Sequence, residues 1–113
     1  MNRLDFTTTD CEDLACHTGV TFIVDFLVID DCTNIAQNLA GYTARMLIYD
    51  VTESTVIKSV SGTIATPATG VVSFEISATD TGALTVGMYS HFIELTISSR
   101  VYRIAFGNFE VSQ

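Results

Sequence analysis

Apolar residues recur at every second position in several short stretches of this sequence, and this period restricts the fold more than any other feature. In residues 71–77, Val72, Phe74 and Ile76 alternate with more polar neighbours. A two-residue period places one set of side chains on one face of a β-strand, whereas a helix needs apolar residues three or four positions apart. Thr, Val and Ile, which favour extended backbone, supply 37 of the 113 residues. The chain is therefore expected to be all-β.

The same pattern predicts seven to eight strands. Residues 20–30 form the strongest one, and both of its faces are apolar apart from Asp25, which indicates a central strand with one face available to a partner. Further strands are expected at residues 3–9, 43–51, 71–77, 87–97 and 100–111, with a one-turn helical connection at 78–84. Residues 55–66, interrupted by Gly62, are expected to form an edge strand or two short strands. This number of short strands is typical of an immunoglobulin-like antiparallel β-sandwich, formed here as one domain over residues 1–113. Residues 1–18 are expected to form an N-terminal strand and an acidic loop that contains cysteines.

The last predicted strand changes phase. Apolar residues occupy even positions from Tyr102 to Phe106 but odd positions at Phe109 and Val111. A two-residue period cannot change phase without an extra residue. We therefore expect a β-bulge or a strand switch at Gly107-Asn108, where glycine can adopt a positive φ.

The charge balance excludes two classes of partner. Thirteen acidic residues against five basic ones give a net charge of −8. A protein surface that binds phosphates needs clustered lysine and arginine. A surface that binds an anionic membrane needs them as well. The basic residues are instead scattered along the chain, as Arg3, Arg45, Lys58, Arg100 and Arg103. We therefore expect neither a nucleic-acid nor a membrane partner. The first residues also lack the apolar segment of a secretory signal.

Four residues resemble a zinc-ligand set: Cys11, Cys16, His17 and Cys32. Their spacing is not that of a standard zinc knuckle. The strand predicted at residues 20–30 is over about 30 Å long at about 3.3 Å per residue, so Cys32 is expected at the opposite end of the domain. Free thiols and no metal site are the prediction, with a Cys11–Cys16 disulfide as the alternative.

The remaining candidates for chemistry also favour structural roles. Five acidic residues could suggest calcium, but the ligand pattern of an EF-hand is missing and solvated loops are expected: Asp10, Glu12, Asp13, Asp30 and Asp31. His17 and His91 are the two histidines. His91 falls on an apolar strand face, where a hydrogen-bonded and partly buried imidazole is expected. Neither a G-x-S-x-G motif nor a glycine-rich phosphate loop is present. We therefore expect no catalytic residue, no cofactor and no enzyme activity.

Four stretches carry a family resemblance: GVTF at residues 19–22, LAGYTARM at 39–46, TGALTVGMY at 81–89 and GNFEV at 107–111. Over residues 19–111 the sequence resembles the immunoglobulin-like domain at the N-terminus of phage baseplate upper proteins, and related small stand-alone virion proteins of tailed phages. The matching residues are glycines of turns and aromatic residues of the core and corners. The segment between Cys11 and Cys16 has no counterpart in that resemblance.

The resemblance implies a non-enzymatic structural protein of a tailed-phage virion, assembled in the host cytoplasm. Baseplate upper proteins continue into further regions, which this sequence lacks, so a self-contained adaptor or decoration subunit is expected at the tail, baseplate, neck or capsid. Its partners would be other virion structural proteins, reached through sheet edges and loop ends, in a symmetric assembly of many copies. Residues 1–9 and 111–113 are expected to be held by neighbours or by sheet pairing, and the acidic residues 10–13 to meet basic neighbours.

The alternative function is a carbohydrate-binding or host-surface-binding module. Such a module needs an exposed aromatic platform with polar groups around it. The candidate residues for this platform are Tyr42, Tyr49, Tyr102 and Phe106.

Overall fold

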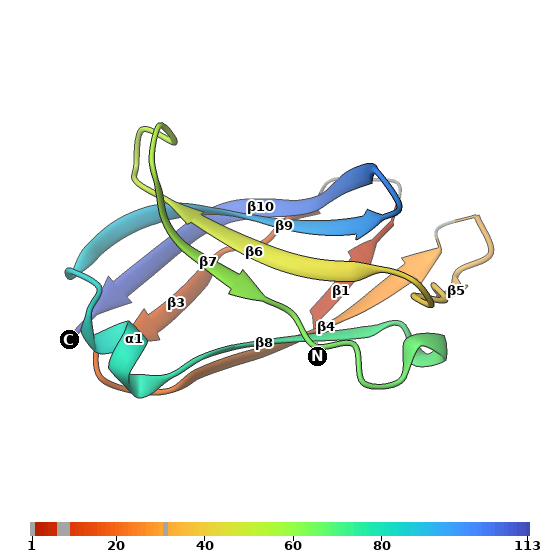
Figure 1. Ribbon diagram of the computed structural model, residues 1–113. Helices are drawn as coiled ribbons and strands as arrows, with labels where there is room; N and C mark the ends of the chain where they lie inside the picture. Colours follow the sequence, from red (N-terminus) through yellow and green to blue (C-terminus); the bar gives the residue numbers. More distant parts are fainter. Residues whose placement is uncertain (1, 7–9, 31) are drawn as a thin grey trace.

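The computed structural model describes residues 2–6, 10–30 and 32–113 as two β-sheets packed face to face (Figure 1). The first sheet contains β1 (Asn2–Asp5), β4 (Phe22–Asp30), β5 (Ile35–Ala36) and β8 (Val71–Ile76). The second contains β2 (Asp10–Cys11), β3 (Leu14–His17), β6 (Thr43–Tyr49), β7 (Val56–Ser61), β9 (Gly87–Ile97) and β10 (Arg100–Ser112). Two short helices connect strands, η1 (Pro67–Thr69) and α1 (Ala78–Gly82). The all-β, immunoglobulin-like sandwich predicted from the sequence is confirmed, but the described residues form ten strands instead of seven to eight. The sandwich is also not wholly antiparallel, because β1, β2 and β3 pair in parallel with their neighbours.

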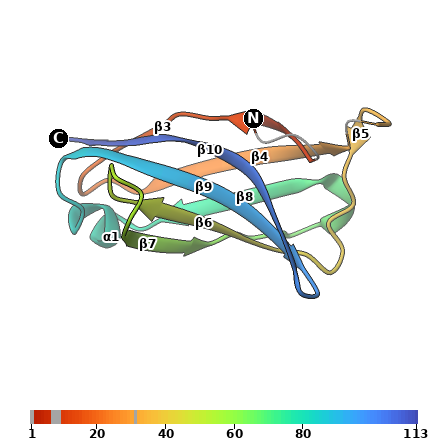
Figure 2. The same cartoon turned by 90° about the horizontal axis from the view of Figure 1, so that it is seen from above.

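The strand predicted at residues 20–30 lies at the centre of the four-stranded sheet, as expected. β4 pairs in parallel with β1 on one side and antiparallel with β8 on the other, while β5 pairs with its last residues. Phe26 and Val28 point into the core between the sheets. Ile23 and Asp25 point the other way and are exposed. Seen from above, the sheet that contains β4 and β8 lies behind the sheet that contains β6, β9 and β10 (Figure 2).

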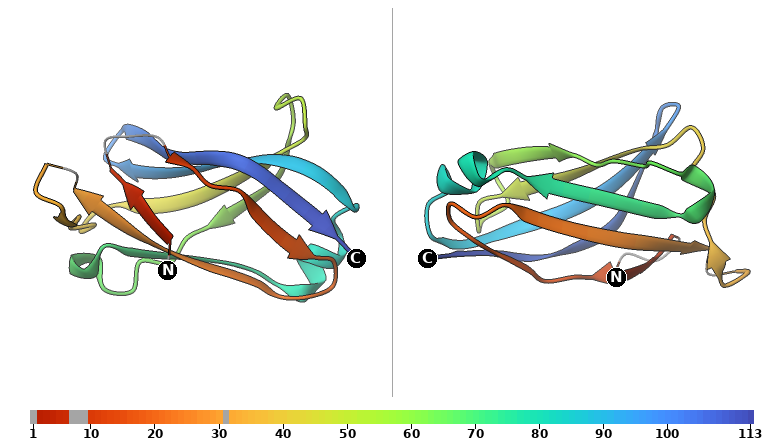
Figure 3. Two further views of the ribbon diagram at one scale, coloured as in Figure 1. Left: turned by 180° about the vertical axis from the view of Figure 1, so that it is seen from behind. Right: turned by 90° about the horizontal axis from the view of Figure 1, so that it is seen from below.

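The acidic loop expected before residue 19 is instead largely strand, which corrects the sequence-based interpretation. β2 and β3 both pair in parallel with β10, so the N-terminal segment leaves the first sheet after β1 and joins the second (Figure 3). The physical reason is a second alternating pattern, because Leu14 and Cys16 are buried while Ala15 and His17 are exposed. Residues 7–9, part of the first predicted strand, lie outside the described residues.

Strand pairing holds the described residues near both ends of the chain. Of the two alternatives expected for these segments, neighbouring subunits or sheet pairing, the structure shows sheet pairing. Asn2 is in register with Phe26 of β4, and Ser112 is in register with His17 of β3. The backbone N–H of Thr18 also donates to the carbonyl of Ser112 at 2.8 Å. The N-terminal segment thereby covers one edge of β4 and one edge of β10, where open edges had been expected.

The phase change predicted in the last strand exists, but its predicted position was wrong. The register of β10 against β9 shifts between Arg103 and Ala105, while Gly107 pairs regularly with His91. Ile104 is the extra residue, and both it and Ala105 are buried. A bulge with two adjacent apolar residues inside is satisfied by Ile and Ala as well as by Gly. Gly107 is also not among the glycines with positive φ.

The connection between β8 and β9 forms the corner that the resemblance implied. The Ser77 hydroxyl oxygen accepts the Asp80 backbone N–H at the start of α1, at 3.2 Å. Thr81 is fully buried, and its hydroxyl donates to the carbonyl of Val20 at 2.9 Å. Leu84 belongs to the core, and the Tyr89 hydroxyl donates to the carbonyl of Thr85 at 2.7 Å. A tyrosine that bonds back to the chain just upstream fixes such corners in immunoglobulin-like domains.

Residues 55–66, interpreted as an edge strand or two short strands interrupted at Gly62, form the edge strand β7 and then cross to the other sheet. β7 pairs with β6 up to Ser61, and Thr63 then forms an isolated bridge with Ser73 of β8 in the other sheet. Gly62 stands at the crossing, where a methyl group would lie 2.9 Å from both the Ala44 and the Phe74 side chains. The absence of a side chain therefore permits the close approach of the two layers there.

Candidate functional site

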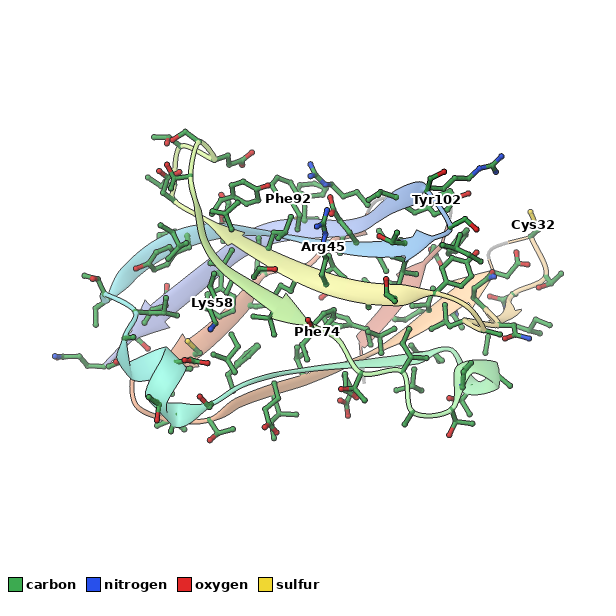
Figure 4. All side chains as sticks on the ribbon, in the orientation of Figure 1. Cys32, Arg45, Lys58, Phe74, Phe92 and Tyr102 are labelled. Carbon is green, nitrogen blue, oxygen red and sulfur yellow. The ribbon has the colours of Figure 1, made fainter. Side chains whose placement is uncertain are left out.

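The structure separates the residues of the proposed zinc set. Cys11 lies opposite Phe106 and Cys16 lies opposite Val111, five residues further along β10. At about 3.3 Å per residue this is about 16 Å, far beyond the reach of a disulfide. Cys32 follows the end of β4, at the opposite end of the sandwich from β3, which contains Cys16 (Figure 4). All three thiols are free, and burial raises the pKa of the Cys16 thiol.

Two of the acidic residues considered for calcium, Asp13 and Asp30, bind backbone groups. The Asp30 carboxylate accepts the backbone N–H of Cys32 at 3.0 Å, and the Asp13 carboxylate accepts that of Asn108 at 3.0 Å. The side chain of Asp10 and the whole of Asp31 lie outside the described residues. Within the part of the chain that the structure describes, no group of three or more His, Cys, Asp and Glu side chains could hold a metal ion, and no helix is long and apolar enough to cross a membrane.

His91 is buried and fixes the N-terminal segment, in agreement with the expected hydrogen-bonded imidazole. Its Nε2 donates to the carbonyl of Glu12, and its ring meets Phe109 edge-on at 6.5 Å between centroids. Its Nδ1 is buried and has no partner among the described residues. Burial lowers the pKa of His91, and the bond to Glu12 and the charge of Asp13 oppose this effect. A neutral ring protonated at Nε2 fits this environment.

The four candidate aromatic residues divide into two groups. Tyr42 and Tyr102 surround Phe6, with ring centroids 5.9 and 5.2 Å from it, and the three rings pack against the edge of the core. Tyr49 and Phe106 instead lie on the outer face of the six-stranded sheet, on the side away from the core. The four candidate rings therefore do not form one platform, because Tyr42 and Tyr102 pack against the core.

Two cross-strand rows on that outer face bring charged and aromatic side chains together. In one row Glu94 of β9 lies between Arg45 of β6 and Arg103 of β10. In the next row Phe92 is in register with Leu47 on one side and Phe106 on the other. We call this surface the arginine–aromatic face, defined by Arg45, Tyr49, Phe92, Glu94, Arg103 and Phe106; Figure 4 shows Arg45 and Phe92 on this outer side of the sheet.

Glu94 is the buried centre of the arginine–aromatic face. Its side chain is only 6% exposed, whereas those of Arg45 and Arg103 are 49% and 44% exposed. Arg45 donates to Oε1 from Nε at 2.9 Å and from Nη2 at 2.8 Å, and Arg103 donates to Oε2 from Nη2 at 2.9 Å. Two guanidinium groups around one carboxylate leave a local charge of +1 on a chain whose net charge is −8.

The aromatic part of this face is ordered by edge-on and cation–π contacts. The Arg103 guanidinium carbon lies 3.8 Å from the centroid of the Phe92 ring. Tyr49 meets the same ring at 5.4 Å and an interplanar angle of 81°. Phe106 remains 41% exposed. A face that combines arginine with half-exposed aromatic rings has the composition of an interface centre rather than that of a solvated surface.

The connection between β6 and β7 rises above the arginine–aromatic face (Figure 1). The Asp50 carboxylate organises it by accepting the backbone N–H groups of Ser54 at 3.0 Å and Thr55 at 3.4 Å. These bonds, chiefly the one from Ser54, lower the pKa of Asp50. Glu53, in the same connection, lines a depression together with Phe92 and Phe106. The aromatic part of the face, at Phe92 and Phe106, is thus hollowed and has an acidic border.

Sequence reasoning missed Phe92 and Glu94 and treated the two arginines as scattered. Arg45 and Arg103 are 58 positions apart in the chain and meet only because β9 pairs with β6 on one side and β10 on the other. One signal was present in the sequence. Glu94 is the only charged residue among residues 87–97 apart from the histidine, and a buried carboxylate needs a basic partner. The strand order that identifies this partner was not available from the pattern alone.

Replacing Glu94 with glutamine tests the centre of this face. We expect the free energy of unfolding to fall by about 1–2 kcal/mol, because charge-assisted bonds to two arginines are replaced by weaker ones while both arginines can still reach water. Denaturant unfolding at pH 7 measures the loss. The matched control is Glu110→Gln on the same sheet face, where the carboxylate is exposed and a change within about 0.5 kcal/mol is expected. Equal losses in the two variants would contradict a structural role for Glu94.

No protein-family model matches the sequence, and no curated protein matches it. A search of solved structures finds the N-terminal domain of phage TP901-1 ORF48, with a TM-score of 0.69 and 12% sequence identity over 98% of this chain and 95% of that one. At this identity the likeness concerns the fold, which extends over nearly the whole of both chains. The chain therefore has an all-β sandwich fold that is also found in a phage protein domain.

Proposed function

We propose that this chain is a non-enzymatic structural subunit of a tailed-phage particle, an adaptor or decoration protein that binds other virion proteins. The observation that carries the proposal is the match of 98% of the chain to a domain of a phage protein. The motifs that resemble baseplate upper proteins support it. The position on the particle, whether tail, baseplate, neck or capsid, follows from the neighbour that the subunit binds.

The roles of the described titratable side chains support a binding function over catalysis. His91 is buried against a backbone carbonyl, Glu94 is held by two arginines, and Cys16 faces the core. A nucleophile and an orienting carboxylate near an accessible base would be needed for the usual hydrolytic chemistry. The arginine–aromatic face, by contrast, offers what protein interfaces use most: arginine, aromatic rings and a buried polar centre.

Particle fractionation tests this proposal. Virions purified by density gradient from cells that produce the phage should contain this chain in a fixed ratio to the major capsid protein, measured by quantitative mass spectrometry. The ratio should stay constant across gradient fractions and after a second gradient. Absence of the chain from particles, or a ratio that declines with each gradient, would contradict the proposal. A soluble host-cell protein added before purification is the control for trapping.

A carbohydrate-binding or host-surface-binding module is the second candidate, and the exposed Phe106 favours it. The geometry of the neighbouring rings opposes it, because Tyr49 and Phe92 are nearly perpendicular at 81° and do not form a flat stacking platform. A glycan array with the purified chain decides between the two. Binding that is lost in Phe106→Ala would favour the second candidate over the first.

A further inference from the structure

We propose that copies of this chain associate head to tail, the arginine–aromatic face of one copy binding the outer face of the four-stranded sheet of the next. The inference deepens the proposed function by naming one partner as a second copy and by naming both contact surfaces. The second surface, the acidic face, is defined by Ile23, Asp25, Leu27, Ser73 and Glu75 of β4 and β8. The two faces lie on opposite sides of the sandwich (Figure 2).

The acidic face is built by the register of β4 and β8. Ile23 lies opposite Glu75 and Asp25 lies opposite Ser73, so two carboxylates flank an apolar side chain. Ile23 is 61% exposed, and both carboxylates belong to exposed residues. No described side chain forms an ion pair with Asp25 or Glu75. The exposed Ile23 beside two carboxylates without an ion-pair partner among the described residues complements the exposed Phe106, which lies in the row next to Arg45 and Arg103.

The arginine–aromatic face supplies the opposite charge. Arg45 uses its Nε and Nη2 on Glu94, and its Nη1 hydrogens have no described acceptor, so they are available to a carboxylate from another copy. Arg45 and Arg103 are two of the five basic residues of the chain. Because Glu94 already holds both guanidinium groups in place, these side chains lose little further conformational entropy on binding, which favours association.

The faces are large enough, and the net charge does not prevent contact. The molecule measures 41 × 26 × 23 Å, so one sheet face covers about 1,000 Å², against about 800 Å² per partner in a standard interface.

Two domains of charge −8, with centres 23 Å apart, repel each other by less than about 1 kcal/mol when the Debye length is about 8 Å. Local pairing of arginine with carboxylate can outweigh this repulsion at physiological salt.

Binding between two different faces has a consequence for assembly. Each copy that binds through one face leaves the other face free, so the contact repeats and forms a ring if the rotation closes or a stack if it does not. A contact between identical faces would stop at a dimer. The head-to-tail arrangement therefore predicts assemblies larger than two at high protein concentration.

Mixing two variants that each lack one face tests the proposal. Asp25→Lys/Glu75→Lys removes the acidic face and alters exposed residues only. Phe106→Glu places a negative charge on the exposed aromatic part of the other face. Val101→Glu, at an exposed position of the same sheet, is a second variant if the first does not fold. Sedimentation velocity at physiological salt should show wild-type assemblies. Each variant alone should associate at least about tenfold more weakly than the wild type, and the mixture should form a one-to-one complex.

A matched control separates the contact from net charge. Glu53→Lys/Glu110→Lys changes the net charge by the same amount as the acidic-face variant but adds positive charge to the arginine–aromatic side, which would face the acidic face of the next copy. If the contact is the one proposed, this variant should associate at least as strongly as the wild type. Monomeric wild-type protein, or a mixture that does not form the complex, would overturn the inference. A chain that is monomeric yet present in particles would leave the proposed function standing, whereas a chain that assembles head to tail yet is missing from particles would contradict only the proposed function.

Discussion

Replacing Gly107 with alanine is expected to lower the free energy of unfolding by about 2–4 kcal/mol, because the added methyl group has no room. It would overlap the carbonyl oxygen of Glu12 and lie 2.7 Å from the Glu12 carbonyl carbon. Glu12 is held there by its backbone N–H, which donates to the Phe106 carbonyl at 2.8 Å, and by the bond from His91 to its own carbonyl. The N-terminal segment must move away, and both bonds weaken. Chemical denaturation measures the loss.

The matched control for this variant is Gly82→Ala. A methyl group at Gly82 would lie 3.7 Å from the Gly19 Cα, an ordinary van der Waals distance, and Gly82 ends the helix α1. Alanine favours helical backbone over glycine, so the free energy of unfolding is expected to stay the same or rise by up to about 1 kcal/mol. If Gly107→Ala proved as stable as Gly82→Ala, the Glu12 carbonyl could not lie against β10.

The fold could be predicted from the sequence where side chains alternate strictly. In β6, β8 and β9 the alternation predicted the strand and its core-facing side, whereas in β4, whose two faces are both apolar, it predicted the strand but not the buried face. The corner was implied by the family resemblance of residues 81–89, which contain its buried Thr81 and its hydrogen-bonded Tyr89. These features depend on residues close in the sequence.

The N-terminal segment could not be predicted in the same way. Leu14 and Cys16 alternate over four residues only, and polar neighbours with three acidic side chains resemble a solvated loop. What makes the segment a strand is the exposed edge of β10, about 95 residues away in the sequence, which accepts it in parallel. The misplaced bulge has a similar cause. Gly107 was assigned positive φ, but glycine is needed there because another part of the chain passes close by.

The arginine–aromatic face shows the same limit for a surface. Alternation places Arg45, Phe92 and Arg103 on the outer side of their strands, yet it says nothing about which strands are neighbours. Only the order β6–β9–β10 brings the guanidinium groups to either side of Glu94. A list of basic residues along the chain therefore describes them as dispersed, although two of them form the positive centre of one face.

Acidification between pH 7 and pH 5.5 is expected to destabilise the protein through His91. Burial lowers the pKa of His91 in the folded protein below 6.5, its value in an unfolded chain. The unfolded state therefore binds more protons as the pH falls below about 6.5, and the free energy of unfolding decreases by up to about 1.4 kcal/mol per pH unit until the folded-state pKa is reached. The loss concentrates on the junction between the N-terminal segment and β9, because the extra proton would be placed on the buried Nδ1.

Two histidine variants separate this effect from the titration of other groups. His91→Phe removes the titrating ring and its bond to Glu12, so it should be about 1–3 kcal/mol less stable at pH 7, yet its stability should change little from pH 7 to pH 5.5. His17 is exposed and hydrogen-bonded to the Ser112 hydroxyl, so His17→Gln should keep the wild-type slope. Thermal or denaturant unfolding of the three proteins across this pH range provides the comparison. A slope that persists in His91→Phe would contradict the assignment of the acid sensitivity to His91.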